Sequence, residues 1–135
     1  MWNMKLNPSK TKTMIVSRSR TGVPVHGELC LGNTVLNESM SLVILGVSFD
    51  SKMLFVDHIR NVASSAGRAL GIMRRANTIL GNVDVIYACF RSYVLSRLEY
   101  CAPVWISADS EHLQLLYAVV RRAEALCGGR LVKKL

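Results

Sequence analysis

Residues 59–80 of this chain, "IRNVASSAGRALGIMRRANTIL", repeat apolar side chains with the period of an α-helix. The apolar positions are Ile59, Val62, Ala63, Ala66, Leu70, Met73 and Leu80. Their i, i+3 and i+4 spacing places them on one face, which is typical of a helix that packs against a core. Gly81-Asn82 can end this helix, and Asp84 is a candidate cap for the next one.

Two further helices are expected downstream. The apolar face of the second consists of Ile86, Cys89, Phe90, Tyr93, Val94 and Leu98. Pro103 is expected to stop it. The third should begin near Asp109-Ser110 and end at Gly128-Gly129. Its expected buried positions are Leu113, Leu116, Tyr117 and Val120.

Upstream of residue 59 the sequence pattern changes to short runs typical of β-strands, at 13–16, 28–31 and 42–49. These runs are separated by turn-forming residues. Short connections without helical crossovers favour antiparallel pairing. The sequence therefore predicts an α+β fold, in which a small antiparallel sheet of three or four strands precedes a three-helix lobe. The expected division is into residues 1–52 and 53–135.

The composition points to a folded, basic protein. The chain has 135 residues, half of them hydrophobic, and a net charge of +8. Its pI near 9.7 favours a polyanionic partner, most simply nucleic acid, although basic ribosomal, membrane-surface and merely soluble proteins share this composition. We expect an intracellular protein, nuclear or cytoplasmic, because no signal peptide and no apolar stretch of about 20 residues is present.

Motifs that carry catalysis are missing from the sequence. It contains no GxSxG, no GxxxxGK[ST] and no HExxH. The aspartates Asp50, Asp57, Asp84 and Asp109 include no adjacent pair, whereas two-metal catalysis needs carboxylates that hold two cations about 4 Å apart. The four cysteines show no metal-ligand spacing, and we expect no cofactor in this chain. Because no secretory signal is present, we expect them to be reduced thiols in the core.

The arginines of the first helix are regularly spaced. A +4, +3 repeat defines a cationic stripe made of Arg60, Ser64, Gly67, Gly71, Arg74 and Thr78. Arg68 and Arg75 lie beside it. Each glycine inside a helix costs about 1 kcal/mol relative to alanine, so close approach of another surface is the expected compensation. That surface is either a neighbouring helix or a nucleic-acid backbone, to which arginine can bind bidentately.

Three other features have a structural and a functional interpretation. Basic residues on an edge strand commonly prevent aggregation, and the first run is flanked by Lys10, Lys12, Arg18 and Arg20. His58 is expected to make local hydrogen bonds and not to bind a ligand. Trp105 is expected to anchor the core between the second and third helices.

Five segments, in order, resemble non-LTR (LINE-type, jockey-like) retrotransposon reverse transcriptases. The resemblance covers about Trp2 to Gly129. The segments are "LNPSKTKTMIVSRSR", "LVILGVSFD", "HIRNVASSAGRALGIMRR", "SRLEYCAPVW" and "HLQLLYAVVRRAEALCGG". The resemblance implies the edge of a right-hand polymerase palm, followed by a helical thumb that holds the template–primer duplex.

The resemblance also implies roles for individual residues. Asn7, Lys10 and Thr11 match motif D, whose lysine would lie near the incoming triphosphate. The primer grip, motif E, is matched by Leu45, Gly46 and Val47, with Asp50 following. The expected nucleic-acid-binding residues are Arg18, Arg20, Arg60, Arg68, Arg74 and Arg75.

The departures from the family limit what this chain can do. The catalytic aspartates of motifs A and C, which hold Mg²⁺, would precede Met1, as would the fingers. The family often has Gln before the basic pair of the third helix, where this chain has Val119-Val120 before Arg121-Arg122. We therefore expect a fragment that binds RNA template and RNA/DNA or DNA duplex but is inactive alone. The alternatives are a non-enzymatic basic nucleic-acid-binding module and a transposon remnant without function.

Overall fold

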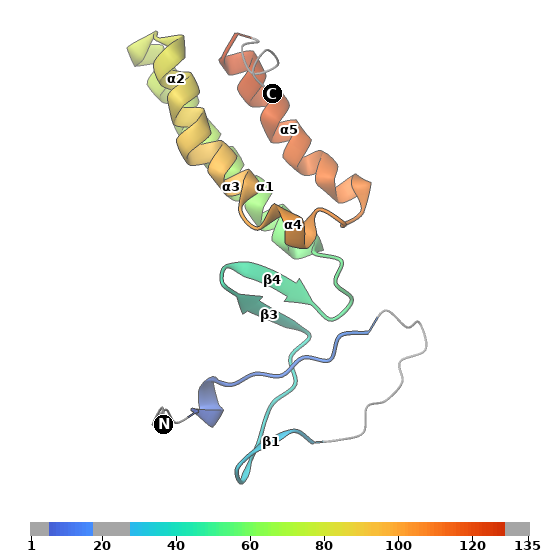
Figure 1. Cartoon of the computed structure of the whole chain (residues 1–135). Coiled ribbons are helices and arrows are strands. Elements are labelled where there is room, and N and C mark those ends of the chain that lie inside the picture. The colour runs from blue at the N-terminus through green and yellow to red at the C-terminus, as the bar shows by residue number, and fades with distance from the viewer. Residues whose placement is uncertain (1–5, 18–27, 129–135) are drawn as a thin grey trace. The chain divides into compact units, whose positions relative to one another are not determined.

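The computed structural model describes residues 6–17 and 28–128 of a chain that divides into two units, 1–54 and 55–135 (Figure 1). Each unit is described by itself. The first contains two small antiparallel sheets and the second is helical. The expected α+β class is confirmed at this level.

The first unit is built from two hairpins. β1 (Cys30–Leu31) pairs with β2 (Thr34–Val35), and β3 (Ser41–Ile44) pairs with β4 (Val47–Asp50). A 3₁₀ turn, η1 (Pro8–Lys10), precedes them. The two sheets are separate, so the expected single sheet of three or four strands is wrong.

The run expected as one strand at 42–49 is a hairpin. Ile44 pairs with Val47, which leaves Leu45 and Gly46 as a two-residue connection. Their φ angles are 50° and 84°. Positive φ at both positions is the mark of the type I′ turns that suit hairpin twist. For leucine, this left-handed conformation costs roughly 1–2 kcal/mol.

The segment from Thr13 onward forms no regular strand. Thr13 makes one isolated parallel bridge to Glu38, and its carbonyl accepts a 2.7 Å hydrogen bond from the N–H of Ser39. Four residues later, the N–H of Ser17 donates to the carbonyl of Ser51 at 2.9 Å. The segment is thus attached to two different stretches, and neither attachment continues into a ladder.

The second unit consists of helices that run up, down and up (Figure 1). In chain order these are α1 (Val56–Leu80), α2 (Val83–Cys89), the π-helical segment η2 (Phe90–Leu95), α3 (Ser96–Glu99), α4 (Ala102–Trp105) and α5 (Ser110–Leu126). α2, η2 and α3 form one continuous rod, because the residues at both junctions keep right-handed helical angles. α1 packs against this rod and against α5.

The π-helical segment keeps the core face of the rod aligned. The buried residues of the rod are Ile86, Phe90, Val94 and Leu98, and each follows the previous one by four positions. In a regular α-helix, steps of four drift about 40° each around the axis. The wider π turn removes part of this drift, so the four side chains face one core. The other buried residues of the helical unit are Phe55, His58, Ile59, Ala66, Ala69, Leu70, Met73, Trp105, Leu116, Val119, Ala123 and Cys127.

The helix ends follow the sequence closely, with two corrections. Gly81 ends α1 at φ 57°, as expected. Asn82, and not Asp84, caps α2, because its side chain accepts the N–H groups of Asp84 and Val85. Pro103 does not stop the second helix but lies in the first turn of α4, where a missing N–H is tolerated.

Several expected core residues lie elsewhere. Tyr93 and Tyr117 are 61 % and 62 % exposed, and Leu80 is 55 % exposed at the end of α1. The π segment explains Tyr93, because the wider turn moves it away from the stripe at Phe90 and Val94. On α5 the buried face is Leu116, Val119 and Ala123.

Trp105 and His58 pack in the core of the helical unit. Trp105 is buried and its indole N–H donates to the carbonyl of Tyr100 at 3.0 Å. The ring of His58 lies 6.1 Å from that of Trp105, tilted by 55°. Burial lowers the pKa of the His58 imidazole.

Candidate nucleic-acid interface

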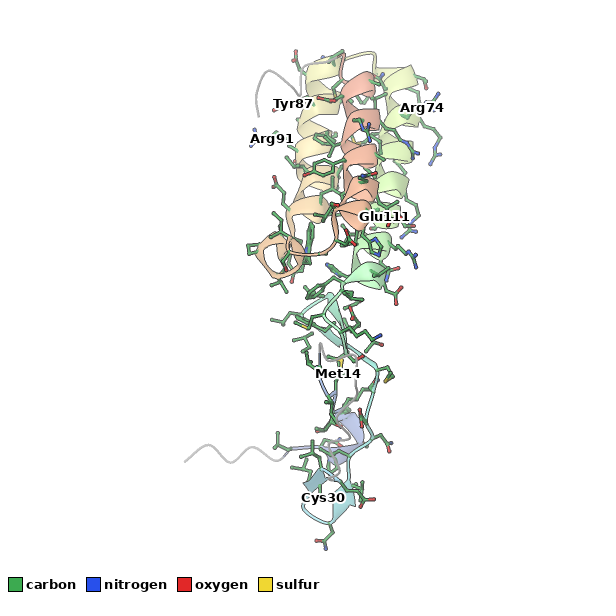
Figure 2. All side chains as sticks on the ribbon, turned by 90° about the vertical axis from the view of Figure 1, so that its right-hand side faces the viewer. Met14, Cys30, Arg74, Tyr87, Arg91 and Glu111 are labelled. Atoms are coloured by element: carbon green, nitrogen blue, oxygen red, sulfur yellow. The ribbon has the colours of Figure 1, made fainter. Side chains whose placement is uncertain are left out.

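The cationic stripe lies along one flank of α1. Arg60, Arg68, Arg74 and Arg75 are all exposed. Figure 2 shows Arg74 projecting from α1 and Arg91 projecting from the rod on the other side of the helical unit. The +4, +3 spacing therefore brings Arg60 and Arg74 to one flank, with Arg68 and Arg75 further round the helix.

Local contacts engage only part of this charge. Arg60 faces Asp57 at 3.9 Å, with both side chains largely exposed, and such surface pairs are worth about 0–1 kcal/mol. Arg68 donates a 2.9 Å hydrogen bond to the hydroxyl of Ser64. Among the described residues, no carboxylate lies within ion-pair distance of Arg74 or Arg75. These cations remain available to an anionic polymer.

The two glycines of the stripe do not pack closely against another described helix. A Cβ built on Gly67 or Gly71 would meet no atom within 4 Å outside the local helix. Compensation by tight helix–helix packing, one of the two expected explanations, is therefore wrong for the described part of the chain. The glycines leave a smooth, open flank instead.

A groove between α1 and α5 borders the stripe. Its volume is about 530 Å³, and its lining residues are Gly67, Leu70, Gly71, Arg74, Val119, Arg122, Ala125 and Leu126. The sequence did not predict Arg122 as part of this site. The residues before the pair Arg121-Arg122 depart from the family pattern, which counted against a role for both arginines. Adjacent helical positions point about 100° apart, so Arg121 lines a different hollow on α5. The three-residue offset from Val119 to Arg122 places the two residues on one flank of α5.

Lys10, the motif D candidate, ends a small capped turn. The side chain of Asn7 accepts from the N–H and hydroxyl of Ser9 at 3.0 and 2.7 Å, and the hydroxyl of Thr11 donates to the Asn7 carbonyl at 2.9 Å. Asn7 and Thr11 thus have local structural roles. Lys10 itself is exposed.

The primer-grip candidates form the tip of the β3–β4 hairpin. Leu45 is 85 % exposed at the turn, whereas Val47 is buried at the start of β4. The Asp50 carboxylate accepts from the N–H of Lys52 at 3.0 Å and from the N–H of Leu54 at 3.0 and 3.1 Å. Asp50 therefore closes the loop after β4.

The remaining candidates contribute less to the interface. Arg18 and Arg20 lie outside the described residues. In the described part of the chain, no group of three or more His, Cys, Asp or Glu could hold a metal ion. All four cysteines are free thiols. The expectation that they are core residues holds for Cys127 and is wrong for Cys30, which is exposed, while Cys89 and Cys101 are half-buried.

No helix in the described ranges has both the length and the apolar character needed to cross a bilayer.

The second unit has a flank of exposed arginines with little side-chain bulk between them, next to a groove that carries one more arginine, Arg122. In comparisons with known proteins, no family model, no curated protein and no solved structure matches this chain.

Proposed function

We propose that this chain is the palm edge and first thumb helices of a non-LTR retrotransposon reverse transcriptase. In this proposal α1 holds the template–primer duplex by its backbone, and the β3–β4 hairpin supports the primer end. Lys10 would approach the incoming triphosphate in the intact enzyme, whose Mg²⁺ ligands lie in upstream segments.

The observation that carries the proposal is the exposed arginines beside Gly67 and Gly71. A duplex grip that ignores base sequence needs cations that reach phosphates and little side-chain bulk between them. Both are present on one helix. The positively charged composition of the whole chain supports the same class of partner.

A salt titration with an RNA/DNA duplex tests the grip. Each phosphate contact steepens the decline of log affinity with log salt by about 0.9. Replacing Arg60, Arg68 and Arg75 together by alanine should therefore reduce that slope by as much as about 2.7. The matched control replaces Arg91, Arg97 and Arg121, which removes the same charge from other helices. An equal loss of slope in both triple variants would reject the α1 flank as the site.

A second titration separates a polymerase fragment from a plain basic module. A fragment with a primer grip should bind a primer–template with a recessed 3′ end several-fold tighter than a blunt duplex of equal length. A basic module that reads only phosphates should bind both equally. Leu45→Ala should remove the preference without changing the salt slope.

The chain alone should not extend a primed RNA template with Mg²⁺ and nucleoside triphosphates. The physical reason is that no described carboxylate cluster could position two metal ions. Incorporation above a protein-free blank, retained after further purification, would contradict the assignment of catalysis to segments upstream.

A further inference from the structure

The groove between α1 and α5 has a chemistry different from that of the outer arginines. Its floor and sides are aliphatic or have no side chain: Gly67, Leu70, Gly71, Val119, Ala125 and Leu126. Only Arg74 and Arg122 are charged, and they come from different helices. None of the described residues that line it is acidic.

The two glycines leave open space beside α1 at this groove. Each weakens α1 by about 1 kcal/mol relative to alanine. Outside the local helix, no described atom lies within 4 Å of the position of either Cβ. The space beside them is therefore wide enough for the ridge of another element, and the weakening of α1 is not compensated within the described chain.

The length of the groove matches a helix. From Gly67 to Arg74 the α1 wall spans seven residues, which is about two helical turns or roughly 10 Å. A docked helix presents its i, i+4 and i+7 side chains over the same length. A nucleic-acid backbone has no apolar ridge to place against Ala125 and Leu126, so the aliphatic lining favours a protein helix.

Charge complementarity specifies the partner further. Arg74 and Arg122 would face carboxylates on the flanks of such a helix. Arginine is the usual residue for partly desolvated pairs of this kind. The acidic residue Glu111 lies near the start of α5, away from Arg74 (Figure 2). Glu124 follows Arg122 closely in sequence but lines a different hollow of α5. Among the described residues, no carboxylate lies within ion-pair distance of Arg74 or Arg122.

We propose that the α1–α5 groove binds an amphipathic helix of another protein, with an apolar ridge flanked by Asp or Glu. The site shares Gly67, Gly71 and Arg74 with the flank proposed to hold the duplex, but its test measures helix binding and not duplex binding. It uses Gly67, Gly71, Arg74 and Arg122, whereas the duplex variants change Arg60, Arg68 and Arg75. The two proposals can therefore fail separately.

A displayed library of 18-residue helices, randomised on one face, provides the probe. It is selected on the intact chain, with the Gly67→Leu/Gly71→Leu double variant as the counter-target. Both leucines enter open space, so the variant should fold, which its circular dichroism and thermal unfolding will show. We expect enriched helices with apolar i, i+4 and i+7 positions and acidic flanks. Failure to enrich such helices, or equal binding to both targets, would overturn the proposal.

Charge reversal then tests the arginines. Arg74→Glu/Arg122→Glu should weaken the best selected helix at least tenfold, and a copy of that helix with Lys in place of its acids should regain affinity for this variant. The control, Arg91→Glu/Arg121→Glu, has the same net charge and should stay within twofold of the original chain. Equal losses in both variants would refute a specific role for Arg74 and Arg122. Displacement of the helix by RNA/DNA duplex would identify nucleic acid as the occupant.

Discussion

Gly71 and Gly81 show how one residue type can serve opposite purposes in a single chain. Gly71 lies inside α1, with open space where a Cβ would stand. Gly81 also has open space, but its φ of 57° ends the helix in a conformation that disfavours every L side chain. Both positions have room for a Cβ, and the two glycines differ only in their φ angle.

This contrast predicts stability changes of opposite sign. Gly71→Ala should stabilise the helical unit by about 0.5–1 kcal/mol, because alanine favours the helix and restricts the unfolded chain. Gly67→Ala should do the same. Gly81→Ala should destabilise by about 1 kcal/mol. Urea unfolding followed by circular dichroism measures all three, and a destabilising Gly71→Ala would show that α1 is packed more tightly there than the structure indicates.

His58 predicts a pH dependence of folding. Burial lowers its pKa in the folded state below the unfolded value of about 6.5, so the unfolded state binds protons more readily. The contribution of neutral His58 is complete above that value, and stability should fall as the pH drops below about 6.5. His58→Gln should flatten this dependence between pH 7 and 5, as measured by urea unfolding. A pH dependence that His58→Gln leaves unchanged would contradict this assignment.

At the scale of single residues, the sequence predicts where helices begin and end, but not which of two neighbouring side chains forms the cap. The glycine at 81 and the capping aspartate at 109 follow from short-range rules. Asn82 took the cap expected of Asp84, because it stands directly after the left-handed glycine and reaches two N–H groups. The turn at Leu45-Gly46 was obscured by a leucine in a conformation that leucine rarely adopts.

At the scale of elements, the rod of α2, η2 and α3 is the least regular part of the fold. Ser92 and Ser96 each donate a hydroxyl hydrogen bond to the carbonyl four residues earlier, at 3.0 and 2.6 Å. Such bonds often accompany bends in helices. A π turn keeps side chains spaced four residues apart on one face more closely than an α turn does. The sequence predicts the apolar positions of this rod, whereas its π geometry follows from packing those positions against one core.

Deleting Ser92 should convert the π segment into regular α-helix. The buried positions would then be spaced four, three and four apart, which suits an α-helical face. We expect the deletion to change the free energy of unfolding by about 1 kcal/mol or less. Chemical denaturation of the purified variant measures this.

Deletion of Ser64, another exposed helical serine, is the matched control. It would turn Ile59 about 100° from the face formed by Ala66, Leu70 and Met73. The expected loss is about 4 kcal/mol or more, since a core face would be broken. Equal losses for the two deletions would mean that the π segment is required for packing in its own right.

At the scale of the whole molecule, the two units differ in how well they cover their apolar residues. In the first unit, exposed large apolar side chains include Leu6, Leu29, Val35, Met40, Val43, Ile44, Leu45 and Leu54. A two-stranded sheet is marginally stable by itself. The helical unit also exposes large apolar side chains, such as Ile72 and Ile79, but it buries an extended core, whereas Val47 is the buried apolar residue among those described in the first unit. This imbalance predicts that the first unit is the less stable of the two.

Limited proteolysis should therefore remove the first unit first. Trypsin is expected to cut at Lys10, Lys12 and Lys52 well before it cuts at Arg68 or Arg91, because proteolysis follows local opening. Mass spectrometry should find a persistent fragment that begins at Met53. A persistent fragment that retains residues 6–52 would contradict the difference in stability.

How much of the candidate site was predictable also depends on scale. The stripe on α1 follows from helical period alone, because all its members lie on one element. The groove does not, since pairing Gly71 and Arg74 with Arg122 requires the packing of α1 beside α5. Residues 51 positions apart, such as Gly71 and Arg122, are brought together by tertiary structure that periodicity does not encode.

The up-down-up order of the helical unit has a consequence for how the chain acquires its structure. α1 packs against the rod that follows it in sequence and also against α5, which comes later in the chain. Helical units of this size commonly fold in microseconds to milliseconds. The hairpins of the first unit leave the ribosome earlier, yet short two-stranded sheets gain little from local contacts. We expect the half of the chain that is made first to become ordered last.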